Sequence, residues 1–158
     1  MHGVTTQNHL HLVRNESVPF SPLIPAREIT DRRVRKAIAY MREDLTRRMS
    51  LMSLAHHVKI SPRQLSRLFQ SETKCSPIHY LHLLRLEEAC FLLGSSFQRV
   101  KAIRLEVGLE DEANFMHEFK KLIGCTPLEY RGKMMRLENR VHFYQFIFVA
   151  MGEEMLVR

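Results

Sequence analysis

Apolar residues recur at steps of three and four along most of the chain from residue 32 onward, which is the spacing of helices that bury one face. The first series follows Thr30 and Asp31, either of which can cap a helix. Its members are Val34, Ala37, Ile38, Met41 and Leu45. The series predicts a helix over residues 32–47.

Two shorter helices follow from the same spacing. Ser50 can cap the first, and Pro62 suits the first turn of the second. Their inward positions are Leu51, Leu54, Ala55 and Val58 in the first and Leu65, Leu68 and Phe69 in the second. A longer helix, "PIHYLHLLRLEEACFLLG", then opens at Pro77 and ends at Gly94. It is apolar over much of its circumference, so we expect it to be buried between two bodies.

The pattern then starts again, and "KCSPIHY" at 74–80 returns as "GCTPLEY" at 124–130. Leu65, Phe69, Cys75, Pro77 and Tyr80 match Phe115, Phe119, Cys125, Pro127 and Tyr130 at an offset of fifty, and Leu54, Val58 and Ile60 match Ile103, Val107 and Leu109 at forty-nine. The sequence therefore predicts an all-helical protein with a duplicated unit. Apolar spacing alone leaves open a helical array with no site.

Each unit has the spacing of a helix-turn-helix, with small Ala55 at the place where the first pair of helices would cross. In that motif the second helix lies in the major groove of DNA. Polar residues share the face opposite the apolar one, and the DNA-contact candidates are Ser61, Arg63, Gln64, Ser66, Arg67 and Gln70. Arg suits guanine and Gln suits adenine. A solvated surface is the alternative reading of such a face.

Composition agrees with a small helical protein. The chain has 158 residues, 45% apolar and 26% charged, with six Gly, six Pro and no Trp, so it has room for one domain or two very small ones. Cys75, Cys90 and Cys125 form no CxxC pair, which favours a reducing compartment and a role as small core residues. The start of the chain lacks the pattern of a secretory signal, so we expect a cytoplasmic protein.

The formal net charge of +7 indicates an anionic partner. Residues 32–80 contain eleven Lys or Arg and three acidic residues, whereas residues 81–131 contain seven and eight. The basic charge thus lies in the first unit.

The run "LAHHVKISPRQLSRLFQSETKCSPIHYLHLLRLEEACFLL", followed by "IRLEVGLEDEANFMHEFKKLIGCTPLEYR", closely resembles the AraC/XylS-type bacterial transcription regulators. The resemblance covers residues 33–135. It implies seven helices, two helix-turn-helix units joined by a central helix, and two recognition helices in successive major grooves about 34 Å apart on one face of the DNA. Members of the family mostly activate transcription by contacting RNA polymerase.

The second unit departs from the family pattern. Arg104 stands where a small residue, usually Ala, lets the helices approach, Leu109 stands for Phe, and His117 for Arg. In the first unit Lys74 stands for a frequent Gly. The second recognition helix, expected over 111–122, is crowded by Glu110, Asp111, Glu112 and Glu118, and negative charge near phosphate costs affinity. Its DNA-contact candidates are Asn114 and His117 for bases and Lys120 and Lys121 for phosphates, and we expect the first unit to dominate.

These patterns divide the chain into a polar tail at 1–31, a DNA-binding domain at 32–136 and an apolar extension at 137–158. Within the domain we expect a first subdomain at 32–76, a linker helix at 77–94 and a second subdomain at 97–136. The extension is too short to cross a membrane. It can pack on the second unit, mediate self-association, or be a non-native extension prone to aggregate.

We therefore expect a regulator of double-stranded DNA, either stand-alone or a fragment of a longer protein, with no cofactor, no membrane partner and no enzymatic activity. A rival hypothesis is an interaction module with weak DNA binding, motivated by Arg104 and the acidic second helix. A metal-sensing hypothesis rests on Cys75, His79 and His82, which fall at steps of four and three.

Overall fold

The computed structural model describes residues 23–24 and 28–136. Within these residues the chain forms seven helices and no strand, so the predicted all-helical class is confirmed. The helices are α1 (Arg32–Glu43), α2 (Leu51–His57), α3 (Pro62–Thr73), α4 (Pro77–Ser95), α5 (Val100–Glu106), α6 (Glu112–Ile123) and a last helix at 127–136. The apolar extension and its three readings lie outside the described residues.

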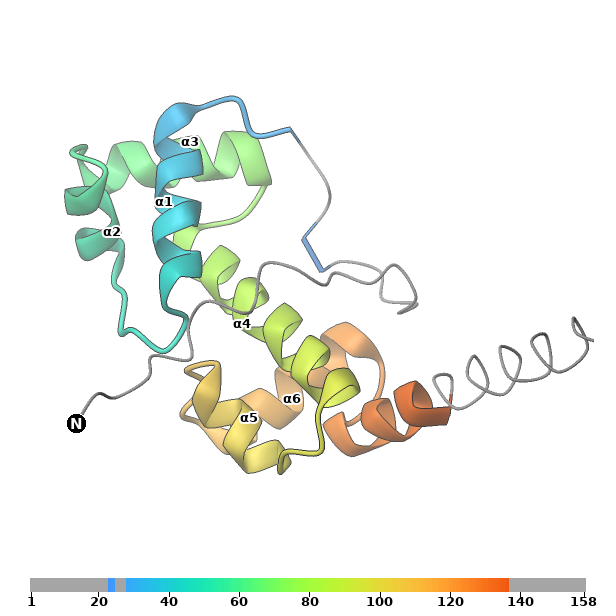
Figure 1. Ribbon diagram of the computed structural model, residues 1–158. Coiled ribbons are helices and arrows are strands. Elements are labelled where there is room, and N and C mark those ends of the chain that lie inside the picture. The colour runs from blue at the N-terminus through green and yellow to red at the C-terminus, as the bar shows by residue number, and fades with distance from the viewer. Residues whose placement is uncertain (1–22, 25–27, 137–158) are drawn as a thin grey trace, which may run out of the picture.

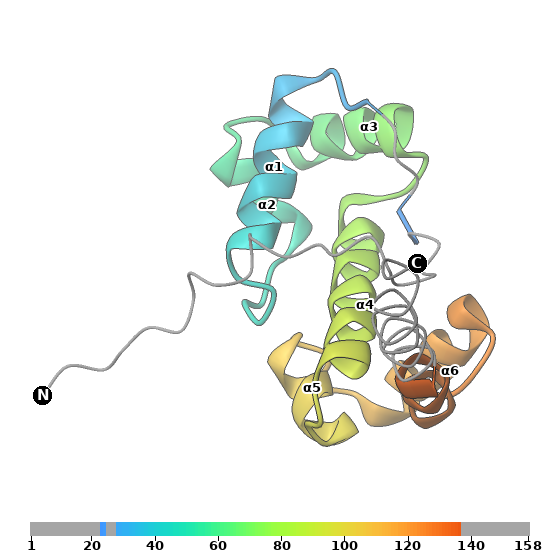
Figure 2. The same cartoon turned by 45° about the vertical axis from the view of Figure 1, so that its right-hand side comes forward.

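The molecule consists of two helical units joined by α4 (Figure 1). Helices α1 to α3 surround one core, and α5, α6 and the last helix surround another. Seen from a second direction, α4 runs from one unit to the other (Figure 2). Tyr80, Leu81 and Leu84 belong to the first core, and Leu86 and Leu93 to the second. The expectation that this helix is buried between two bodies is confirmed.

The duplication is visible in the backbone. The turn of the first unit is closed by bonds from Val58 N to Leu54 O and from Ile60 N to Ala55 O, and the same two bonds recur 49 residues later in the second unit. Positive φ values also pair off, at Lys59 with Gly108 and at Lys74 with Gly124. The turn between α2 and α3 and the turn between α5 and α6 therefore have the same conformation.

Side-chain packing repeats as well. Phe69 packs edge-on against Tyr80 with ring centroids 5.7 Å apart, and Phe119 packs the same way against Tyr130 at 5.8 Å. Both pairs tie a recognition helix to the helix that follows it. A contact of this kind adds about 0.5–1.5 kcal/mol beyond the burial of its area.

Some predicted helix bounds were wrong. The first helix ends at Glu43 rather than 47, because the Asp44 carboxylate accepts hydrogen bonds from Thr46 N and Arg47 N and so replaces the helical pattern with a turn. Helix α4 continues to Ser95, one residue past Gly94, and α6 lies one residue later than expected. Asp111 is outside α6 because it is the cap.

Candidate nucleic-acid interface

The first recognition helix, α3, starts with a reciprocal capping arrangement. The Ser61 hydroxyl accepts from Gln64 N at 3.2 Å, and the Gln64 side chain accepts from Ser61 N at 3.2 Å. Pro62 fits the first turn because its missing N–H has no helical partner to lose. Ser61 and Gln64, both predicted to contact DNA, thus already hold the start of the helix.

The outer face of α3 carries two arginines at adjacent turns. Arg63 and Arg67 are exposed, whereas Leu65 and Phe69 on the opposite face are 0% exposed. Among the described residues neither arginine has a hydrogen-bond or ion-pair partner, so both guanidinium groups are available to an anionic ligand. Buried apolar contacts on one side and unpaired cations on the other are the features that a DNA-recognition helix needs.

The other predicted contacts on α3 are less open. Gln70 is exposed, but its amide donates to Lys74 O at 3.2 Å. Ser66 is half-buried. Among the described residues of this helix, the two arginines are therefore the strongest candidates.

A groove of about 460 Å³ lies beside Arg67. It is lined by Arg33, Gln64, Arg67, Leu68, Gln70 and Ser71. Arg33 comes from the start of α1 and was missed by the sequence reasoning, although the adjacent basic residues after the cap Asp31 are a visible signal. Its guanidinium is held by the Asp31 carboxylate, with Nη2 and Oδ2 2.8 Å apart.

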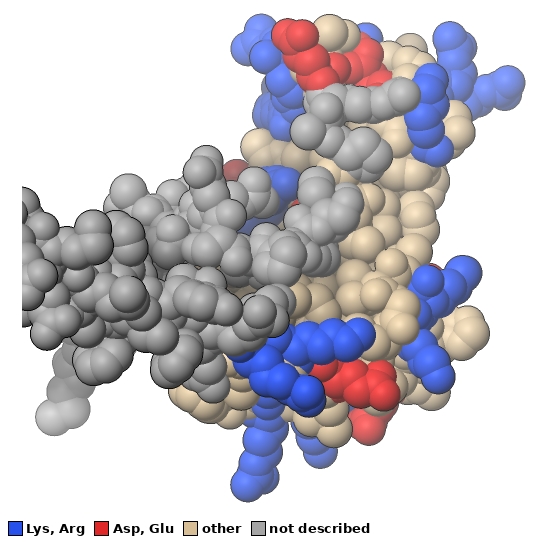
Figure 3. Space-filling view, turned by 90° about the vertical axis from the view of Figure 1, so that its right-hand side faces the viewer, with Lys and Arg blue, Asp and Glu red and all other residues tan. Residues whose placement is uncertain are grey.

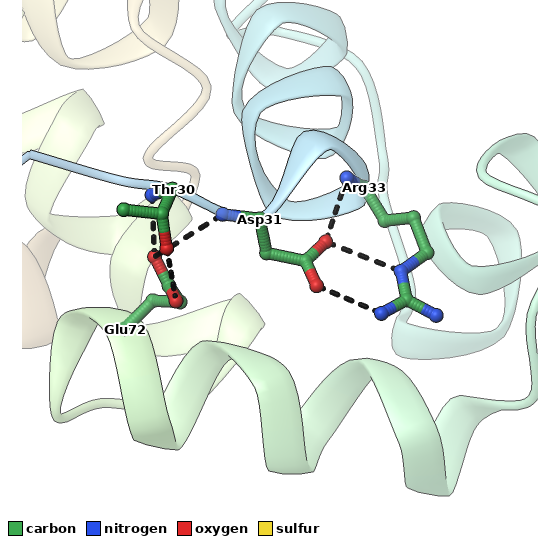
Figure 4. A network of polar contacts seen from close by, with 4 residues as sticks. All are labelled: Thr30, Asp31, Arg33 and Glu72. Atoms are coloured by element: carbon green, nitrogen blue, oxygen red, sulfur yellow. Dashed lines mark hydrogen bonds and ion pairs between the residues drawn. The ribbon is translucent and has the colours of Figure 1, made fainter.

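A network of polar contacts fixes the start of α1 against the end of α3 (Figure 4). The Glu72 carboxylate accepts from Thr30 N at 2.7 Å and from the Thr30 hydroxyl at 3.0 Å. These bonds, led by the one from Thr30 N, lower the pKa of Glu72. Through this network the segment before α1 and the recognition helix are held together.

The second recognition helix, α6, has the same two faces. Phe115 and Phe119 are buried, and Asn114, His117, Lys120 and Lys121 are exposed on the outer side. The Asp111 carboxylate caps the helix by accepting from Asn114 N at 2.8 Å. The four predicted contact residues of the second unit therefore remain accessible.

Each carboxylate that crowds α6 has a local partner. Glu110 pairs with Arg48 at 2.8 Å, Glu112 lies 3.6 Å from Arg104, and Glu118 lies 3.5 Å from Lys121. Asp111 is the helix cap. Partners of opposite charge reduce the field of these carboxylates, and one of those partners, Lys121, is itself a predicted phosphate contact.

Arg104 is buried at the turn between α5 and α6. Its side chain is 7% exposed and donates to the carbonyls of Leu109 (2.8 Å) and Glu110, at the turn that leads into α6. Its Nε has no partner among the described residues. The large residue at the Ala55 position thus binds the turn, a role that its type alone did not reveal.

Charged side chains lie over both units of the molecule (Figure 3). On the face shown in Figure 3, Lys and Arg side chains lie over both ends of the molecule, with Asp and Glu side chains among them.

Cysteine and histidine form no metal cluster in the part of the chain that the structure describes. Cys90 and Cys125 are buried, and burial raises the pKa of the Cys90 thiol. Cys75 is half-buried, with Sγ 3.3 Å from the Thr73 hydroxyl. In the same described part, no helix is long and apolar enough to cross a bilayer.

The fold and this site define a protein with a tandem helix-turn-helix DNA-binding domain. A family model described as "Helix-turn-helix domain", of the AraC type, matches residues 54–133. The chain belongs to the AraC/XylS family of transcriptional regulators.

The chain is also similar to individual proteins and to solved structures. The chain is 32% identical over 102 residues to the arabinose operon regulatory protein of Escherichia coli K12, covering 64% of this chain and 35% of that protein. The C-terminal domain of AraT, a response regulator from Geobacillus stearothermophilus, matches with 33% identity and a TM-score of 0.61 over 65% of this chain and 86% of that one. The DNA-binding domain of AdpA, solved with a target DNA, shares the fold at 24% identity and a TM-score of 0.61, over 65% and 93%. The chain spans about a third of the length of the curated relative.

Proposed function

We propose that the protein is a sequence-specific regulator of transcription that reads double-stranded DNA through α3 and α6. The observation that carries the proposal is the exposed row of Arg63 and Arg67 opposite a buried core, in a unit that occurs twice. Arg63 and Arg67 read base edges, with Gln70 and Ser66 beside them, and Ser61 and Gln64 order the start of the helix. In the second unit Asn114 and His117 face bases, and Lys120 and Lys121 face phosphates.

Selection of bound fragments from random DNA at about 150 mM salt, followed by footprinting, tests this function. We expect one consensus with two half-sites about one helical turn apart. Equal affinity for every duplex would refute sequence-specific recognition.

Substitutions on α3 and α6 separate base reading from phosphate binding. Arg67→Ala or Arg63→Ala should cost about 1–3 kcal/mol of binding free energy and relax the base preference, whereas Lys120→Ala should weaken all sequences alike. Arg67→Lys is the matched control, because it keeps the charge but loses the planar donor pair that fits guanine. Unchanged binding in all of these variants would contradict the assignment of the site.

We further propose that the protein activates transcription through RNA polymerase and works in the cytoplasm at the nucleoid, without enzymatic activity or a cofactor. Transcription in vitro from a promoter that carries the selected sequence tests activation. Pull-down of polymerase beside a DNA-shift titration tests the rival hypothesis of an interaction module. Tight, specific DNA binding by the chain alone would exclude that rival.

A further inference from the structure

The two turns have the same backbone but different residues. Lys59 has φ 60° and an exposed side chain, whereas its counterpart Gly108 has φ 75°. A positive φ therefore does not by itself require glycine in this turn. A Cβ at Gly108 would lie 2.5 Å from Leu45 O and 3.0 Å from Thr46 Cα. Both atoms are backbone of the loop between α1 and α2, so the first unit touches the second at this glycine.

Arg85 of α4 lies at the same contact. Its Nε donates to Leu45 O at 2.9 Å and its Nη2 to Arg47 O at 3.0 Å. Its Cζ would be 3.2 Å from a Cβ at Gly108. Burial lowers the pKa of this guanidinium. Arg85 thus joins the linker helix, the loop of the first unit and the turn of the second.

The loop that Arg85 holds is itself well ordered. The Asp44 carboxylate accepts from the Thr46 hydroxyl at 2.6 Å and from Thr46 N at 3.0 Å, and Arg47 lies over the Tyr40 ring at 4.7 Å. Arg48 adds an ion pair with Glu110 of the second unit at 2.8 Å. Because both of these side chains are exposed, this pair contributes alignment more than stability.

We propose that Arg85 and Gly108 are positioning residues, which clasp the α1–α2 loop to the α5–α6 turn and thereby fix the separation of the two recognition helices. Two units joined by a single helix can rotate relative to one another at the ends of that helix, whereas a second contact between the units holds them in one orientation. The clasp then decides which half-site spacing the protein accepts, since each recognition helix must meet its groove. This consequence rests on the proposed function, but the geometry of the clasp does not.

A measurement without DNA tests the clasp first. Spin labels at Ser71→Cys of α3 and Ala113→Cys of α6, in a Cys75→Ala background, report the distance between the two recognition helices. With only Cys75→Ala and the two label sites changed, we expect one narrow distribution of label distances. Adding Arg85→Met should give a broad distribution, and adding Arg85→Lys, which keeps one donor, an intermediate one. Gly124→Ala, which has φ 83° with nothing within 4 Å of an added Cβ, should leave the distribution unchanged. The same narrow distribution in Arg85→Met and Arg85→Lys would overturn the clasp.

A DNA titration tests the consequence. The probes are the duplex selected by the unmodified chain, versions with the half-sites moved by one and two base pairs, and a version with one half-site scrambled. The unmodified chain should lose about tenfold or more in affinity for each moved probe, the size expected for one lost base contact. Arg85→Met should bind moved and original duplexes alike, with unchanged affinity for the single half-site.

An unchanged spacing profile in Arg85→Met, or an equal loss on every probe including the single half-site, would overturn the positioning role. If selection yields no preferred duplex, the proposed function fails. The spin-label distances would then still decide whether the clasp exists.

Discussion

Replacement of Gly108 by alanine probes the contact between the units, and the structure supplies its own control. Both Gly108 and Gly124 have positive φ, 75° and 83°, so alanine is strained at either position. Only at Gly108 does the added Cβ meet other atoms, two of which belong to the backbone of another loop. The difference between the two variants therefore isolates the contact from the strain.

The expected magnitudes follow from these two terms. The left-handed conformation costs an alanine about 1–2 kcal/mol, and the smaller entropy of its unfolded chain returns about 0.4–1 kcal/mol. Gly124→Ala should thus destabilise by about 1 kcal/mol. At Gly108 the loop must move away from a contact of 2.5 Å, and overpacking of this kind costs about 1–3 kcal/mol more. We expect Gly108→Ala to destabilise by about 2–4 kcal/mol in total.

Urea unfolding followed by helical circular dichroism measures both values in the same buffer. The slope of free energy against urea should stay constant, because the folded state keeps its buried surface. Equal destabilisation of the two variants, within about 0.5 kcal/mol, would refute the conclusion that the loop presses on Gly108. A larger loss in Gly124→Ala would do the same.

Three further substitutions test particular contacts. Arg104→Met should cost about 1–3 kcal/mol in urea unfolding, since the buried carbonyl of Leu109 loses a charged donor, and a gain in stability would contradict that role. The hydrogen bond from the Arg33 side chain lowers the pKa of Asp31 from 3.8 to about 2. The stability that the ionised Asp31 contributes is therefore present above pH 4 and is lost as the pH falls toward 2. In Asp31→Asn the free energy of unfolding should depend less on pH in that window. Lys59→Gly should raise the free energy of unfolding by about 0.5–1 kcal/mol, as relief of positive φ exceeds the entropy cost, and thermal melting checks it.

The fold followed from the sequence because its determinants are local and occur twice. Proline at first-turn positions and Ser or Thr before it mark helix starts at Pro62, Pro77 and Pro127, and all three helices begin there. Helix ends were harder, since Asp44 ends α1 through side-chain bonds that compete with the helix. Whether such a residue caps, turns or continues a helix depends on its neighbours in space.

The exposed polar faces of α3 and α6 could also be predicted from the sequence, because helical periodicity alone places Arg63 and Arg67 opposite Leu65 and Phe69. The hydrogen-bond partners and the burial of individual side chains could not be predicted. Periodicity could not show that Gln64 is used in capping or that Ser66 is half-buried. Both depend on rotamers and on packing against α1 and α2, which no spacing records.

Comparison of the two copies locates what the sequence left undecided. Where the copies agree, as at Phe69 and Phe119, the residue serves the interior of its own unit. At one position where they differ without a change of backbone, the surroundings differ: Lys59 faces solvent, whereas Gly108 meets the other unit's loop. Arg104 in place of Ala55 instead serves its own unit, since it binds the carbonyls of its own turn next to the carboxylate of Glu112. Of these breaks in the repeat, the one at Gly108 marks the contact between the two units, whereas the one at Gly124 faces open space.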